Sequence, residues 1–138
     1  VNARMPAYVV HKLERALKKR GRGLKGARIL LLGIAYKENV DDLRESPGLR
    51  LSRLLEKAGA RVDYHDPYIP RARSGRHGFA KDSVPLTEKT LARADAVLVV
   101  TAHSGIDYAW VAENARLVVD TRNAMAHVGA HRDKIVKA

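Results

Sequence analysis

The sequence has 138 residues, of which 46% are hydrophobic and 30% are charged, and it contains no cysteine. This composition predicts one soluble domain without disulfides, thiolate metal sites or a cysteine nucleophile, and no apolar run approaches the ~20 residues of a membrane span. Lys and Arg outnumber Asp and Glu by 26 to 15, giving a net charge of +11, so a polyanion such as nucleic acid has to be weighed as a partner.

The first predicted elements are a helix and a buried strand. Pro6 opens a helix whose apolar residues recur at helical spacing, and the basic segment Lys18–Arg28 closes it. Gly21 or Gly23 supplies the left-handed stop. Residues 27–34 are an apolar run without polar alternation, which is typical of a strand covered on both faces.

The middle of the chain predicts a helix, a strand and a loop. Ser46-Pro47 is a cap followed by proline at the first helical position, and Gly59 ends this second helix. Residues 61–65 predict a short strand. Residues 71–86 are polar and predict a loop, with at most a fragment of strand near Phe79.

The remaining predicted elements are a helix from Thr87 to Arg93, a strand over 95–101, a helix over 107–114 and a strand over 115–120. The tail beyond Asn123 shows no firm period. This alternation predicts parallel strands joined by right-handed crossovers, hence an α/β fold, a three-layer Rossmann-like domain with a mainly parallel sheet.

Polar residues gather where three of these strands end, in segments 36–44, 101–104 and 120–123. Ligands of parallel sheets bind at this edge, so the convergence predicts a binding site. Gly33 is followed by Ile-Ala-Tyr, so the G-x-G-x-x-G fingerprint of a dinucleotide site is absent. His103 is interpreted as a ring satisfied within its loop, and the scattered histidines have no metal-ligand spacing.

Lys37, Arg44 and Arg122 are the cations near this edge. Lys37 and Arg44 can contact a phosphate or can simply neutralise the neighbouring acids, and spacing alone leaves both interpretations open. Arg122 poses the same choice, and an arginine directly after a buried strand is costly unless it has a partner.

Four motifs carry a family resemblance: VNARMP at 1–6, GIAYKENVDDLRESP at 33–47, YHDPYIP at 64–70 and VVDTRNA at 118–124. Together they resemble the carboxy-terminal, UDP-binding domain of the UDP-glucose/GDP-mannose dehydrogenase family, and the pattern is most similar to its UDP-N-acetylglucosamine 6-dehydrogenase branch. The resemblance covers nearly the whole chain and is weakest over residues 71–86.

The resemblance implies an enzyme that oxidises the C6 alcohol of a nucleotide sugar to a carboxylate with NAD. It implies that Tyr36, Lys37 and Arg122 bind the UDP-sugar, and that Arg44 reaches the NAD pyrophosphate. It assigns no catalytic and no metal-binding residue to this chain, because the cysteine nucleophile and the glycine-rich NAD turn belong to other parts of the family's enzymes.

The same resemblance implies a division of the chain. Residues 1–24 are expected to be a linker and helix that follow the central dimerisation helix, and residues 25–138 are expected to be the UDP-sugar-binding domain. We expect a piece of a longer, cytoplasmic, homodimeric enzyme whose amino-terminal domain binds NAD. Alone, this chain is expected to oxidise nothing.

The alternative is a basic α/β module that binds nucleic acid or another polyanion through Lys18–Arg28 and Arg71–Arg76. Aromatic residues make up only 5% of the chain and do not alternate with basic ones, which disfavours stacking on single-stranded bases. The resemblance favours the nucleotide-sugar interpretation, whereas the identity of the sugar and the role of the arginine-rich loop stay open.

Overall fold

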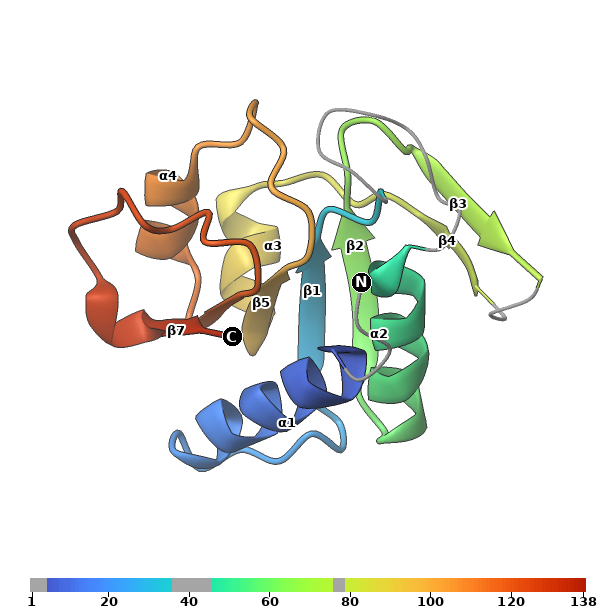
Figure 1. The fold of residues 1–138 in the computed structure, drawn as a ribbon, viewed down its shortest axis with the longest axis horizontal. Helices are drawn as coiled ribbons and strands as arrows, with labels where there is room; N and C mark the ends of the chain where they lie inside the picture. Colours follow the sequence, from blue (N-terminus) through green and yellow to red (C-terminus); the bar gives the residue numbers. More distant parts are fainter. Residues whose placement is uncertain (1–4, 36–45, 76–78) are drawn as a thin grey trace.

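The fold is built on a parallel sheet, as the sequence predicts. The structure is a computed structural model that describes residues 5–35, 46–75 and 79–138. Within these residues, one sheet has five strands, all parallel, in the order β2-β1-β5-β6-β7 (Figure 1). The strands are β1 (Arg28–Leu32), β2 (Arg61–His65), β5 (Ala96–Val99), β6 (Val118–Asp120) and β7 (Ile135–Lys137).

Helices cover both faces of this sheet and confirm the three layers. They are α1 (Met5–Lys18), α2 (Pro47–Lys57), α3 (Glu88–Arg93) and α4 (Tyr108–Asn114), with a 3-10 turn at Arg132–Lys134. Ile29 and Leu31 of β1 pack in the core beneath α1 and α2, whereas Leu30 and Leu32 pack in a second core with α3 and α4. None of the described helices is long and apolar enough to cross a membrane.

The helix boundaries follow from local chemistry that the sequence already displays. Ser46 Oγ accepts a hydrogen bond from the Gly48 amide at 3.2 Å and caps α2. Thr87 forms a capping box with Thr90 at the start of α3. Asp107 caps α4 through the amide of Trp110 at 3.1 Å. These three helix starts confirm the predictions.

A hairpin replaces part of the predicted loop at residues 71–86. β3 (Arg71–Ser74) and β4 (Phe79–Asp82) pair antiparallel as a separate two-stranded sheet. The predicted fragment of strand near Phe79 is confirmed by β4, whereas the prediction of a loop was wrong for β3. Ala72 is the one buried residue of β3, which leaves too little apolar periodicity to predict a strand. The ring of Phe79 contacts the ring of Tyr64 with centroids 5.9 Å apart, so the hairpin is anchored to β2.

The tail beyond Asn123 holds the strand β7, which the sequence did not reveal. Its three residues are only partly buried, so no clear pattern marks them. Lys134 fixes the segment, since its Nζ donates to the carbonyls of Ala112, Glu113 and Ala115, each at 3.1 Å. These carbonyls end α4, where a cation complements the helix dipole.

Gly33 sets the path of the chain where β1 ends. Its φ is +85°, and a Cβ placed there would lie 2.6 Å from both Cβ and the carbonyl oxygen of Thr101. No side chain fits that space. The close approach brings the exits of β1 and β5 together at the point where the strand order reverses. Open parallel sheets bind their ligands at this switch point.

We expect Gly33→Ala to lower the free energy of unfolding by roughly 2 to 5 kcal/mol, because it combines a left-handed backbone with overpacking. Urea denaturation measures this loss. Gly23→Ala is the matched control, since a Cβ at Gly23 meets nothing within 4 Å. Equal stability of the two variants would contradict the tight contact at Thr101.

A second expectation concerns Tyr64, whose side chain is fully buried and whose hydroxyl donates to the carbonyl of Ile69 at 2.9 Å. Burial first, and then the charges of Asp66 and Asp82, raise the pKa of Tyr64 from 10.0 to about 12. The folded-state pKa therefore lies above the unfolded one, so this stabilisation is complete below pH 10 and is lost as pH rises to about 12.

Tyr64→Phe cannot ionise, so we expect its free energy of unfolding to fall less steeply across that alkaline interval than that of the wild type. Urea denaturation at several alkaline pH values gives both slopes. Parallel slopes would show that Tyr64 does not titrate in this way.

Candidate functional site

The candidate site lies at the carboxyl edge of the sheet, where the loops after β1, β2, β5 and β6 meet. Two of the three polar segments predicted for this edge are described, 101–104 after β5 and 120–123 after β6. These strands are neighbours in the sheet, so that part of the prediction is confirmed. The third, residues 36–44, falls outside the described residues.

Asp66, directly after β2, organises this edge. Its side chain is buried, and its Oδ2 accepts hydrogen bonds from the amides of Ile34 at 2.8 Å and Ala35 at 2.9 Å. Its Oδ1 accepts from the amide of Tyr68 at 2.8 Å. A buried carboxylate is tolerated only when such bonds replace water. Asp66 therefore fixes the backbone that leads toward residue 36.

His103 completes this arrangement from the loop after β5. Its ring is fully buried, and its Nε2 lies 3.0 Å from Oδ2 of Asp66. The ring also lies beside that of Tyr68, with centroids 4.9 Å apart. The ring therefore has a hydrogen-bond partner, as the sequence analysis expected, but the partner lies in the loop after β2 and not in the loop of His103.

Two hydroxyls hold the carbonyls of the same turn. Thr101 Oγ1 donates to the carbonyl of Ala35 at 2.7 Å, and Ser46 Oγ donates to the carbonyl of Ile34 at 2.5 Å. Both hydroxyl residues are buried. The turn after β1 is therefore bonded on its amides and on its carbonyls, which makes it a rigid support.

This bonding bears on dinucleotide binding at the turn. In a Rossmann site, the amides after the first strand approach the pyrophosphate. The amides of Ile34 and Ala35 already donate to the Asp66 carboxylate. These donors are therefore not available to a pyrophosphate, so the described residues do not fit NAD there. This agrees with the absence of the glycine fingerprint.

Arg122 is presented by a loop that Asp120 organises. Asp120 is buried at the end of β6, and its carboxylate accepts from the amides of Arg122 at 3.0 Å, Ala124 at 3.1 Å and Met125 at 2.8 Å. Asn123 takes a left-handed φ of 59° within this loop. Because Asp120 faces inward, the loop leaves the side chain of Arg122 exposed.

The guanidinium of Arg122 has no hydrogen bond or ion pair with any residue that the structure describes. Because this side chain is exposed, it does not carry the desolvation cost expected for an arginine buried directly after a strand. The other three candidates, Tyr36, Lys37 and Arg44, lie outside the described residues, so their roles stay predictions.

Sequence reasoning missed the role of Asp66, which it included only as part of the motif at residues 64–70. The available signal was an acidic residue directly after a strand that pairs with β1. The described residues contain no cluster of three or more His, Cys, Asp or Glu side chains that could hold a metal ion.

The two basic segments of the alternative interpretation do not form one surface. The loop after α1 lies below the sheet in Figure 1, whereas the β3–β4 hairpin lies at the opposite upper end. Arg22 is engaged with Asp95 at 3.5 Å, and Arg73 with Asp82 at 2.9 Å. A single nucleic-acid contact surface is therefore disfavoured.

Comparison with known proteins gives one matching family model. It is described as the UDP-glucose/GDP-mannose dehydrogenase family, UDP binding domain, and it matches residues 30–127. The match includes the Asp66 network and the Asp120 loop. It also includes residues 36–45.

Two curated relatives illustrate the range of sugars. A UDP-N-acetyl-D-mannosamine dehydrogenase of Pyrococcus horikoshii is 32% identical over 89% of this chain and 28% of its own length. A UDP-N-acetyl-D-glucosamine 6-dehydrogenase of Pseudomonas aeruginosa is 34% identical over 75% of this chain and 24% of its own length. This chain thus spans only about a quarter of these relatives.

Solved structures agree in fold. The UDP-D-ManNAc dehydrogenase of Pyrococcus horikoshii superposes with a TM-score of 0.77 at 26% identity, over 99% of this chain and 31% of that one. The NDP-N-acetyl-D-galactosaminuronic acid dehydrogenase of Methanosarcina mazei gives a TM-score of 0.78 at 26% identity, over 98% and 29%.

We expect Asp66→Asn to lower the free energy of unfolding by about 3 kcal/mol, because an amide group would turn a donor toward the amides of Ile34 or Tyr68. Urea denaturation measures this loss. Asp63→Asn is the control, since Asp63 is exposed and has no bonded partner among the described residues. A loss no larger than that of the control would contradict the organising role of Asp66.

Proposed function

The chain belongs to the UDP-glucose/GDP-mannose dehydrogenase family, and on this premise we propose that its carboxyl edge binds the diphosphate of a UDP-sugar. The observation that carries the proposal is Arg122, whose exposed guanidinium has no partner among the described residues and is held at that edge by the Asp120 loop. A guanidinium can donate two parallel hydrogen bonds to phosphate oxygens.

The geometry supports different roles for the acidic and the basic residues at this edge. Asp66 and Asp120 are buried acids whose carboxylate oxygens accept hydrogen bonds from backbone amides. In this proposal they position the loops and do not contact the ligand. Arg122 supplies exposed positive charge. In this proposal, Tyr36 and Lys37 complete the UDP-sugar contacts from the segment after β1, as the family resemblance implies.

We propose that the intact enzyme oxidises the C6 alcohol of the sugar to a carboxylate with NAD. NAD would supply the hydride acceptor, held mainly by an amino-terminal domain, with Arg44 of this chain reaching its pyrophosphate. The occupied amides of Ile34 and Ala35 support a location of NAD away from this turn. The chain contains no cysteine, so the nucleophile would also lie elsewhere.

UDP-N-acetylglucosamine is the proposed substrate, on the resemblance of the motifs to that branch. Relatives are named for N-acetylglucosamine, N-acetylmannosamine and glucose, so the sugar is the least supported part of the proposal. A homodimer and a cytoplasmic location of the intact enzyme stay predictions from the sequence, as does the division of the chain at residues 24 and 25.

We expect UDP to bind this chain, and Arg122→Gln to weaken its affinity about tenfold to a hundredfold, since a charge-assisted hydrogen bond contributes about 1.5 to 3 kcal/mol. Isothermal titration calorimetry measures the dissociation constants. Lys37→Ala is expected to weaken binding in the same titration.

Arg53→Gln is the matched control for this titration. It removes one positive charge from an exposed position on α2, away from the carboxyl edge. Equal affinity of the wild type and Arg122→Gln for UDP would refute the assignment. An equal loss of UDP affinity in Arg53→Gln would show that the effect comes from the net charge of the chain and not from the position of Arg122.

A further inference from the structure

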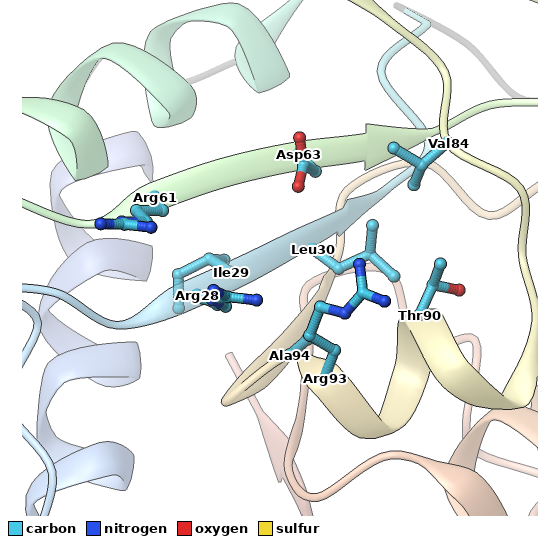
Figure 2. Close-up of a pocket in the computed structure, with 9 residues that line it drawn as sticks. All are labelled: Arg28, Ile29, Leu30, Arg61, Asp63, Val84, Thr90, Arg93 and Ala94. Carbon is cyan, nitrogen blue, oxygen red and sulfur yellow. The ribbon is translucent and has the colours of Figure 1, made fainter.

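A second candidate anion-binding feature of the fold lies away from the carboxyl edge, in a groove of about 190 Å³ beside α3. Figure 2 shows its lining side chains arriving from β1, β2 and α3. The groove starts near the amino ends of the strands, at Arg28 and Arg61, and extends to Val84. None of its residues belongs to the site proposed above.

The groove exists because the sheet is only partly covered on this side. On β2, alternate residues are exposed, and these include Arg61 and Asp63. The neighbouring helix α3 packs with Leu91 in the core and presents Thr90 and Arg93 toward the groove. Leu30, which packs in the same core as Leu91 of α3, contributes an apolar side chain to this lining.

Three arginines line this groove: Arg28, Arg61 and Arg93. Figure 2 shows the Arg93 side chain reaching from α3 over Leu30 in the direction of Asp63. None of the three guanidiniums has a hydrogen bond or ion pair within the part of the chain that the structure describes.

Some other arginines do have partners, whereas Arg53 and Arg122 have none among the described residues. Arg132 donates to the carbonyls of Met125 and Val128, and Arg73 pairs with Asp82. The groove arginines are distinguished by their common position along one concave surface, where their guanidiniums are not bonded to any described residue. Unpaired guanidiniums at a concave surface are suited to the oxygens of a phosphate.

Asp63 indicates that the ligand also has hydrogen-bond donors. Its carboxylate accepts hydrogen bonds only, and within the described residues it has no partner. A bare polyanion gains nothing from this group, whereas hydroxyl groups can donate to it. The groove therefore combines a phosphate-binding side, a hydroxyl-binding group and an apolar side chain.

The size of the groove limits the ligand. Pockets for drug-sized ligands have volumes of about 300 to 1,000 Å³. A groove of about 190 Å³ is too small to enclose a dinucleotide or a whole nucleotide sugar. From these observations we propose that the groove between β1, β2 and α3 binds a small phosphorylated sugar, with Arg28, Arg61 and Arg93 on the phosphate and Asp63 on the hydroxyls.

The test uses glucose 6-phosphate, inorganic phosphate and glucose as probes in calorimetric titrations of the chain. Glucose 6-phosphate is expected to bind with the highest affinity of the three. Arg28→Gln and Arg93→Gln are expected to weaken its binding about tenfold or more, which corresponds to the loss of one charge-assisted hydrogen bond.

Arg53→Gln and Arg122→Gln are the controls, because each removes the same charge at another face. Both are expected to leave the affinity for glucose 6-phosphate unchanged, and this separates the groove from the proposed UDP site. Asp63→Asn is expected to lower the ratio of the affinity for glucose 6-phosphate to that for inorganic phosphate.

Three results would overturn the proposal. The first is the absence of saturable glucose 6-phosphate binding at millimolar concentrations. The second is equal weakening by Arg53→Gln and Arg93→Gln, which would reflect net charge alone. The third is equal affinity for inorganic phosphate and glucose 6-phosphate, which would leave an anion site without sugar recognition.

Discussion

One buried carboxylate determines the shape of the edge on which the proposed function depends. Asp66 follows β2, bonds the amides at the exit of β1 and contacts His103 after β5. Three strand ends are therefore fixed to a single group. Removing a charge from water is costly, so the fold is stable only with all of these donors in place. The loops after β1, β2 and β5 therefore form one rigid support.

The strongly basic composition is divided by the fold into separate populations. Some arginines end helices or close loops, as Arg132 does when it bonds the carbonyls of Met125 and Val128. Others have no partner among the described residues, and these include Arg122 at the carboxyl edge and the three arginines of the groove beside α3. Net charge alone suggests a single polyanion-binding surface. The geometry instead supports two small, distinct anion sites.

Much of the fold was predictable because local signals dominate it. The apolar runs of β1 and β5 indicate strands covered on both faces, and the caps at Ser46, Thr87 and Asp107 mark helix starts. The strands β3 and β7 were missed because both are short and partly exposed, whereas a fragment of β4 was predicted near Phe79. Their stability comes from partners distant in sequence, which periodicity cannot reveal.

The candidate site was predictable only in outline. Strand ends indicated where ligand contacts gather, and Arg122 was identified from its place after β6. The Asp66 network was not, because its bonds join residues 31 to 37 positions apart. This network also has a consequence for redesign. Inserting glycines after β1 would not convert the domain into a dinucleotide binder while Asp66 holds the same amides. Such a conversion would first require a neutral residue at position 66 and a new anchor for His103.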